Sequence, residues 1–298
     1  MKRSVVIIGS INMDKVYQVP HIPLAGETIL SGSQMKNPGG KGANQAVAAA
    51  LQGAKVHMIG CVGADDDGEA LLRSLGNAGV YTDGVLRLED TPTGIAMIVV
   101  ADDGENTIVV SAGANARVDA GTLDQNDVLL REAGFGVVQL EIPHETAWLA
   151  LRRLRAHGVA TILNPSPACA IPDEALRNTD ILVPNETEMR YLLGHDPDPA
   201  GEDLMAYART KGLKAIVMTL GPEGCCLATP DAVRPFPCTP VRALDSTGAG
   251  DCFLGTMTAW LAGGHPLETA IEKAMAAAAI AVTRPGAQQA MPRREEIA

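Results

Sequence analysis

The sequence predicts an α/β fold, namely a three-layer α/β/α sandwich around a mainly parallel sheet, with a small β-sheet lid. Short β-branched runs alternate with helix-length segments along most of the chain, a pattern typical of a parallel sheet covered by helices on both faces. Two stretches break this alternation and contain paired strand patterns without a helix between them. Because no linker or internal repeat interrupts the chain, we expect one domain over residues 1–298, with the lid formed by about 11–38 and 93–112.

The expected elements follow in order from these patterns. The lid hairpin is predicted by Thr93–Val100 and Thr107–Ser111, which flank a polar turn, and the clearest helix begins at Pro266. Parallel strands are expected at Ser4–Ile8, Val56–Cys61, Val137–Leu140, Val159–Leu163, Ile181–Val183 and Ala215–Thr219, with helices at Thr146–His157 and Asp203–Lys211. Because ligands of such sheets bind at the carboxyl ends of the strands, we expect the functional site there.

Composition excludes several classes of protein. The 298 residues are 46% hydrophobic, which rules out a disordered chain. A net charge of −11 and an aromatic content of 3% make nucleic acid a poor partner, because an acidic surface repels phosphate and few rings are available for stacking.

Membrane and disulfide-rich classes are also disfavoured. No apolar stretch reaches the roughly 18–20 residues of a membrane span, and the run Val5–Ile8 is too short for a signal peptide. The six cysteines show no C-x-x-C spacing, so neither a zinc site nor a disulfide framework is indicated. We therefore expect a reduced, cytoplasmic protein without a membrane partner.

The strongest motif is the segment from Asp245 to Asp251, in which Gly248, Ala249 and Gly250 precede a helical apolar pattern. A glycine turn at a helix N-terminus leaves N–H groups and the helix dipole free to bind an anion. Asp251 then lies in the first turn, where it either caps the helix or acts as a base beside a bound phosphate. The segment lacks the dinucleotide fingerprint, and no Walker A loop occurs elsewhere.

A second glycine-rich segment, from Asn37 to Asn44, predicts either a tight turn or a close-fitting polyol site. Its backbone N–H groups and the Asn44 amide offer donors and acceptors for hydroxyl groups. Asn12 and Asp14 follow the first strand and share one face, because they lie two residues apart. A carboxylate such as Asp14 can accept hydrogen bonds from two neighbouring hydroxyls, as a sugar diol requires.

Two further turns follow predicted strands. Asn185 and Glu188 open a helix, where they either cap it or approach a hydrated Mg²⁺ ion and its phosphates. The turn from Thr219 to Gly224 is either a plain β-turn or the edge of a nucleotide site.

Together these motifs resemble the ribokinase/phosphofructokinase-B family of sugar kinases over nearly the whole chain. The likeness includes Gly9–Asp14, Gly39–Ala46, Asn164–Ala168, Asn185–Glu188, Asp245–Asp251 and Ala276–Gln288. The resemblance implies a ribokinase-like fold and transfer of the ATP γ-phosphate to the 5-hydroxyl of ribose. It also implies activation by K⁺, and a homodimer formed through the lid.

The resemblance assigns roles to individual residues. It makes Asp251 the general base, and Gly248, Ala249 and Gly250 the anion hole. The implied sugar ligands are Asn12, Asp14, Gly40, Lys41, Gly42, Ala43, Asn44, Glu141 and Asp251. The implied ATP and Mg²⁺ contacts are Asn185, Glu188, Thr219, Leu220, Gly221, Pro222, Glu223, Gly224, Gly250 and Met275. The implied K⁺ loop contains Asp245, Thr247, Ala281, Arg284, Gly286 and Ala290.

Other acceptors remain open, namely 2-deoxyribose, fructose or a nucleoside such as adenosine. A non-catalytic sugar sensor on the same fold is a further alternative. Such a sensor would be expected to lack the base or the anion hole, and this sequence retains both Asp251 and the Gly248-Ala249-Gly250 turn.

Overall fold

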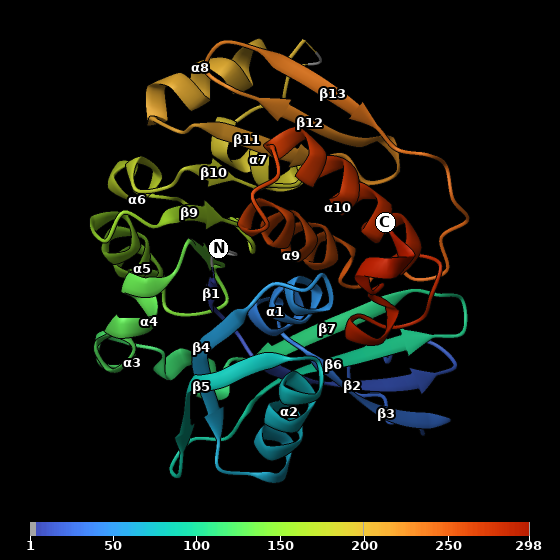
Figure 1. The fold of residues 1–298 in the computed structure, drawn as a ribbon. Coiled ribbons are helices and arrows are strands. Elements are labelled where there is room, and N and C mark those ends of the chain that lie inside the picture. The colour runs from blue at the N-terminus through green and yellow to red at the C-terminus, as the bar shows by residue number, and fades with distance from the viewer. Residues whose placement is uncertain (1–3, 199, 298) are drawn as a thin grey trace.

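A computed structural model describes residues 4–198 and 200–297 of the chain. Its centre is a nine-stranded sheet, drawn from the upper edge to the lower in Figure 1. The spatial order is β13 (Val233–Pro237), β12 (Gly224–Ala228), β11 (Ala215–Thr219), β10 (Ile181–Leu182), β9 (Ala160–Leu163), β8 (Phe135–Val138), β1 (Val5–Ile8), β4 (Val56–Gly63) and β5 (Val80–Leu88). All neighbours from β11 to β5 pair in parallel, whereas β12 and β13 form an antiparallel edge, so the predicted mainly parallel sheet is confirmed.

Helices cover both faces of this sheet, as the alternation of strands and helices predicts. On β1, Val5 and Ile7 belong to one hydrophobic cluster and Val6 and Ile8 to the other, because successive strand residues point to opposite faces. The first cluster is covered by α1 (Lys41–Leu51), α2 (Asp66–Asn77), α9 (Ala249–Ala262) and α10 (Leu267–Ala281). The second is covered by α3 (Ala120–Gln125), α4 (Asp127–Glu132), α5 (His144–Ala156), α6 (Asp173–Arg177), α7 (Glu186–Leu193) and α8 (Glu202–Lys211).

A separate four-stranded sheet projects from the carboxyl end of β1. Its order is β3 (Ser33–Gly39), β2 (Asn12–Val19), β6 (Gly94–Ala101) and β7 (Asn106–Ser111). In Figure 1 its four strands lie together at the lower right, beside the C-terminal segment. The irregular segments of the sequence therefore form the expected small sheet.

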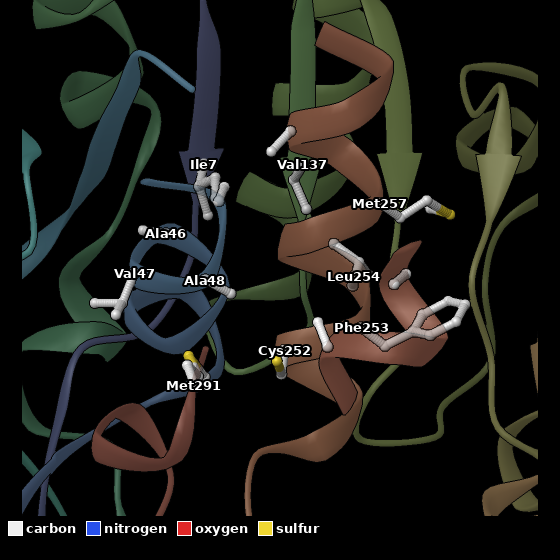
Figure 2. Packing of buried hydrophobic residues seen from close by; sticks show 14 of the residues in the cluster. Ile7, Ala46, Val47, Ala48, Val137, Cys252, Phe253, Leu254, Met257 and Met291 are labelled. Carbon is white, nitrogen blue, oxygen red and sulfur yellow. The ribbon is translucent and has the colours of Figure 1, made fainter. Parts of the chain in front are cut away.

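Helices α1 and α9 pack side by side against the central strands, as Figure 2 shows with Ala48 of α1 facing Leu254 of α9. Gly255 permits this close approach. A Cβ at that position would lie 2.4 Å from the carbonyl oxygen of Gln45 and 2.6 Å from the Cβ of Ala48. The first turns of the two helices are therefore held next to each other, and this proximity builds the site described below.

Within residues 4–198 and 200–297, no helix is both long and apolar enough to span a membrane.

Candidate active site

The site lies where the order of the central sheet reverses. From β1 the chain adds strands through β4 and β5 on one side, and through β8 to β13 on the other. The loops after β1 and β8 therefore diverge, and open α/β sheets bind ligands in such a crevice. Residues 9–10 follow β1 and residues 139–141 follow β8, so both segments reach the crevice.

Asp251 is the buried acid at the centre of the site. It lies in the first turn of α9 and is 8% exposed. Its Oδ2 accepts a hydrogen bond from Asn44 Nδ2 and its Oδ1 accepts one from Gln45 Nε2, each at 2.9 Å. Burial raises the pKa of Asp251, the charge of Lys41 and the two amide donors oppose that rise, and Glu141 adds to it. The structure thus joins the predicted Asn44 and Asp251, and adds Gln45, which the sequence did not single out.

The glycine turn predicted to hold a phosphate forms the N-terminus of α9. Gly248 is its N-cap with a φ of 71°, and a Cβ there would also lie 2.9 Å from the Cβ of Ala287. A Cβ at Gly250 would meet no atom within 4 Å, so the space in front of this turn is open. The N–H of Ala249 donates to the Ser246 carbonyl at 3.2 Å. The other first-turn N–H groups and the helix dipole favour an anion here.

Asn12 and Asp14 lie on the small sheet where it joins β1. They occupy one face of β2, as their spacing predicts. Asp14 is partly buried, and that burial, followed by the charges of Glu141 and Asp251, raises the pKa of Asp14 to about 7. The three carboxylates thus lie close enough to influence one another electrostatically, and their oxygens can accept hydrogen bonds from hydroxyl groups.

Asn115 is a residue of the site that sequence reasoning missed. It is 1% exposed, its Nδ2 donates to Asn12 Oδ1 at 2.7 Å, and its Oδ1 accepts from the N–H of Ile11 at 2.9 Å. The bond to Asn12 Oδ1 fixes the orientation of the Asn12 amide, and it leaves Asn12 Nδ2 as a donor that does not face Asn115. No motif surrounds Asn115, so only the folded chain reveals this role.

The predicted glycine-rich loop folds directly onto the segment after β1. Gly40 has a φ of 89°, a conformation that favours glycine, and a Cβ there would lie 2.7 Å from the backbone nitrogen of Asn12. Gly42 is equally confined, since its Cβ would lie 2.8 Å from Gly9. The N–H of Ala43 donates to the Ser10 carbonyl at 2.9 Å. The loop is therefore fixed beside Asn12 and Asp14 before any ligand binds.

Glu141 joins this loop to the other side of the crevice. Its Oε2 accepts from Ser10 Oγ at 2.6 Å and from the backbone N–H of Lys41 at 3.3 Å. Glu141 follows β8, so its carboxylate connects the segment after β8 with the segment after β1 and with the glycine-rich loop. Glu141 is one of the sugar ligands expected from the sequence.

A cavity of about 530 Å³ lies beside the N-terminus of α9, where Ala249 and Gly250 line it. Its volume is typical of a small-molecule site. Of the predicted nucleotide contacts, Thr219, Gly221, Pro222, Gly224, Gly250 and Met275 line it. The sequence did not indicate the segment after β13, which adds Cys238, Thr239, Pro240, Val241 and Ala243. Beside the predicted Met275, the end of α10 and the residue after it add Ala278, Ala279 and Val282.

The other predicted nucleotide contacts do not line this cavity. Asn185 Oδ1 accepts from the Glu188 N–H at 2.8 Å and Glu188 Oε2 accepts from the Asn185 N–H at 2.9 Å, which is a capping box at the start of α7. Asn185 nevertheless forms a β-bridge with Thr219, so it lies beside the cavity wall. Leu220 and Glu223 close the turn between β11 and β12 through backbone hydrogen bonds.

The predicted cation loop brings together two segments that are distant in sequence. Asp245 Oδ1 accepts from the Thr247 N–H at 2.9 Å, and its Oδ2 accepts from the Gly286 N–H at 2.8 Å. Burial alone would raise the pKa of Asp245, but these hydrogen bonds outweigh burial and lower it. The Ala281 carbonyl accepts from the Arg284 N–H at 3.0 Å, and Ala290 is buried in the segment that follows.

In the described residues, Asp245 pairs with no basic side chain, since Arg284 is paired with Glu296 at 2.6 Å. An ionised, partly buried carboxylate beside backbone carbonyls fits a monovalent cation. Over the same residues, no cluster of three or more His, Cys, Asp or Glu side chains forms a metal site of its own.

A buried acid, a helix N-terminus and a nucleotide-sized cavity thus converge at the carboxyl end of a parallel sheet. Near the acid lie the carboxylates of Asp14 and Glu141 and the glycine-rich loop, which offer hydrogen-bonding groups to a ligand with hydroxyl groups. This arrangement is that of a phosphotransferase that acts on a small polyol.

Comparison with known proteins specifies the family. Residues 2–294 match the pfkB family of carbohydrate kinases. The chain is 36% identical to the ribokinase of Haemophilus influenzae, over 99% of this chain and 97% of that protein. It is 34% identical to the deoxyribokinase of Salmonella typhi, over 98% and 96%. The structure of Arabidopsis thaliana ribokinase complexed with ribose and ATP has a TM-score of 0.94 at 31% identity, covering 100% of this chain and 98% of that one. The chain belongs to the pfkB family of carbohydrate kinases.

Proposed function

We propose that this enzyme transfers the γ-phosphate of ATP to the 5-hydroxyl of D-ribose and so forms ribose 5-phosphate. The observation that carries the proposal is Asp251, buried in the first turn of α9, where Ala249 and Gly250 line the cavity and the carboxylates of Asp14 and Glu141 lie close by. The likeness to ribokinases, one of them in complex with ribose and ATP, supports the choice of both substrates.

In the proposed mechanism the sugar binds first to Asn12, Asp14 and the glycine-rich loop. Asp251 accepts the proton of the 5-hydroxyl as its oxygen attacks the γ-phosphorus, and ADP leaves toward the cavity. The N–H groups at the start of α9 stabilise the charge that develops on the migrating phosphoryl group. Lys41, whose charge already influences Asp251, adds a positive field on the same side.

We propose that Mg²⁺ enters with ATP and that Glu188 approaches it through water, because magnesium retains several of its waters. The second carboxylate oxygen of Glu188 is available for this contact beyond the capping box. Bound Mg²⁺ would neutralise phosphate charge. For K⁺ we propose the loop around Asp245, whose unbalanced charge fits the ion. Bound there, K⁺ would supply positive charge near the anion hole.

We propose that the small sheet is a lid and that it pairs with the lid of a second copy. Residues that pair across strands share a face, and this places Met35, Val16, Ile98 and Ile108 in one apolar row beside Asp14. Met35 and Ile108 are 48% and 55% exposed. A second copy seated on this row would cover apolar surface and also close the sugar site.

We further propose a cytoplasmic enzyme whose partners are its sugar and ATP, and not nucleic acid. The six cysteines are free thiols, as is usual in a reducing compartment.

A second acceptor, 2-deoxyribose, is favoured by the similarity to a deoxyribokinase. The carboxylate of Asp14 distinguishes the two sugars in our proposal, because it can accept hydrogen bonds from both hydroxyls of a 2,3-diol. The deoxy sugar would leave one buried acceptor unpaired, at a cost of roughly 1–3 kcal/mol.

The test is ATP consumption with ribose, 2-deoxyribose, fructose and adenosine as acceptors. We expect ribose to give the highest kcat/KM. Asp251→Asn should lower kcat roughly 100-fold or more while changing the sugar KM little, because only the base is removed. Preference for another acceptor would replace ribose in the proposal, and near-normal turnover by Asp251→Asn would remove Asp251 as the base.

A further inference from the structure

Two buried glutamines lie behind the carboxylate of Asp251, and the sequence assigned a role to neither of them. Gln45 on α1 and Gln139 after β8 are both 0% exposed. Gln45 Nε2 donates to Asp251 Oδ1 at 2.9 Å, and Gln139 Nε2 donates to Gln45 Oε1 at 2.6 Å. A chain of amides therefore runs from the end of β8 to the acid.

The direction of this chain is fixed from an independent point. Asn164 Nδ2 donates to the backbone carbonyl of Val183 at 3.0 Å, and a carbonyl oxygen can only accept. Asn164 Oδ1 must then face Gln45, whose Nε2 donates to it at 3.3 Å. Both N–H bonds of the Gln45 amide are thus used, one toward Asn164 and one toward Asp251. A reversed Gln45 amide would place an oxygen against both acceptors.

The arrangement leaves one acceptor unpaired. In the described part of the protein, the buried Gln139 Oε1 has no hydrogen-bond partner. It lies against Gly9, where a Cβ would be 1.7 Å away. A buried acceptor without a partner destabilises a fold. Turning the Gln139 amide would instead bring its oxygen against Gln45 Oε1, where two acceptors would face each other. The unpaired oxygen therefore lies at the end of the hydrogen-bonded series that is farthest from Asp251.

The second oxygen of Asp251 is held in the same way. Asn44 Nδ2 donates to Asp251 Oδ2, and Asn44 Oδ1 accepts from Gln288 Nε2 at 3.0 Å. Both oxygens of the Asp251 carboxylate therefore accept hydrogen bonds from amides, those of Asn44 and Gln45, whose orientation is itself fixed by further hydrogen bonds. Each amide presents a donor, which favours the ionised form of the acid.

Resting on the proposed role of Asp251 as base, we propose that Gln45, aligned by Gln139 and Asn164, is a positioning residue for the reaction. It fixes the plane of the Asp251 carboxylate, so that the remaining lone pairs are aimed at the acceptor hydroxyl. Gln45 touches neither sugar nor nucleotide in this proposal and acts only through Asp251.

The charged and titratable groups that face Asp251 come from several elements. Lys41 belongs to α1, Glu141 follows β8, Asp14 belongs to the small sheet, and Cys252 is the next residue of α9. Burial raises the pKa of Asp251, and Lys41, Asn44 and Gln45 counter it. Removing the Gln45 donor must therefore move the pKa of Asp251 upward, even with these other groups unchanged.

The experiment measures kcat against pH at saturating ribose and ATP for Gln45→Met, which keeps the length of the side chain but removes the donor. We expect the acid limb to move upward by about one pH unit, so that kcat at a pH on this limb falls about tenfold, with activity recovering at alkaline pH. Saturating sugar keeps the titration of Asp14 out of the profile. Gln139→Met should move the limb in the same direction by less.

The matched control is Gln52→Met. Gln52 is also buried, at 1% exposure, and caps the C-terminus of α1, but its Nε2 donates to the Pro292 carbonyl, away from the site. In the Gln52→Met variant, the acid limb of the profile of kcat against pH should stay at the wild-type position.

An unchanged limb in Gln45→Met, or an equal loss of kcat at every pH, would overturn the proposal. If Gln45→Met does not fold, Gln139→Met decides by the same readout, because it leaves Gln45 in place. Failure here is distinct from failure of the proposed function, which would show as turnover by Asp251→Asn or as no ribose phosphorylation by the wild type.

Discussion

The carboxylate of Asp14 occupies the space in which a side chain at Gly39 would begin. A Cβ on Gly39 would lie 2.2 Å from Asp14 Oδ2 and 2.4 Å from its Cγ. Both residues belong to adjacent strands of the small sheet, where Asp14 pairs with Asn37 and Gly39 with Asn12. The first glycine of the Gly-Gly-Lys-Gly loop thus makes room for the acid, apart from any direct contact with a ligand.

Gly39→Ala should therefore weaken sugar binding by displacing Asp14. Hydrogen bonds to a charged group contribute about 1.5–3 kcal/mol, so we expect the KM for ribose to rise roughly tenfold to a hundredfold. Initial-rate kinetics measure this change. Gly32→Ala is the control, because a Cβ there would meet only the Gln18 carbonyl, at 4.0 Å. A wild-type KM in Gly39→Ala would contradict the steric argument.

Sugar affinity should change through neutral pH. Burial and the charges of Glu141 and Asp251 raise the pKa of Asp14 to about 7. Because the ionised carboxylate is the better hydroxyl acceptor, the KM for ribose should fall as the pH rises from about 6 to about 8. Asp14→Asn should bind ribose weakly at every pH, and a pH-dependent KM in that variant would assign the titration to another group.

The stability of the unliganded protein should show the opposite trend. Asp14 ionises near 3.8 when unfolded and near 7 when folded, so between these values the folded state holds one more proton. The contribution of Asp14 to the free energy of unfolding then decreases as the pH rises through this window. Thermal unfolding of Asp14→Asn should lack this decrease, which makes the variant more stable than wild type near pH 8 and similar near pH 4.

Gly255→Ala should separate α9 from α1. The added methyl would overlap the Gln45 carbonyl and Ala48, and overpacking of this kind costs about 1–3 kcal/mol of unfolding free energy. We also expect kcat to fall, because Asn44 and Gln45 would shift away from Asp251. Chemical denaturation and steady-state rates measure the two effects. Gly76→Ala in α2 should be nearly neutral, since a Cβ there meets no atom within 4 Å.

Replacing K⁺ by Na⁺ should lower kcat if the loop around Asp245 binds the cation. Asp245→Asn should remove the difference between the two ions, because it removes the charge that selects a cation at this position. Rates in matched potassium and sodium chloride, at constant ionic strength, decide the point. Equal rates for the wild type in both salts would count against a cation site.

Ile108→Lys should produce a monomer. It places a charge in the apolar row of the small sheet, where Ile108 pairs with Ile98. Light scattering after size exclusion measures the mass. Val128→Lys is the control, because Val128 is also 55% exposed but lies on α4, away from the small sheet. A wild-type protein that is monomeric at high concentration would refute the lid-to-lid dimer.

Much of the fold could be predicted because its signals are local. The run Ala215–Thr219 forms a strand with the predicted bounds, and the helix expected after Pro266 begins at Leu267. The strand expected at Val137–Leu140 lies instead at Phe135–Val138, because its last residues turn into the site. Strands β12 and β13 were not expected. The two adjacent cysteines of β12 and the two prolines of β13 give no recognisable strand pattern, and the prolines are tolerated because β13 lies at the sheet edge.

The site could be predicted where a residue carries its own local signal. Asp251 and Gly248 stand at a recognisable helix start, and Gly40 stands in a glycine-rich turn. Gln139 and Asn115 give no such signal, because a single buried amide has no pattern in sequence. Gln45 follows the glycine-rich turn, but nothing local shows which residue its amide contacts. Their roles depend on partners 94 to 206 positions away, and this pairing exists only in the folded chain.

The hydrogen bond from Gln288 to Asn44 spans 244 positions. During synthesis, α1 leaves the ribosome long before the residues that orient its amide. A nascent or prematurely terminated chain that stops before residue 251 carries the complete sugar loop but no base, and one that stops before residue 288 leaves Asn44 without its anchor. In our proposal, the acid and the amides that orient it therefore come together only once the residues from both distant segments are present.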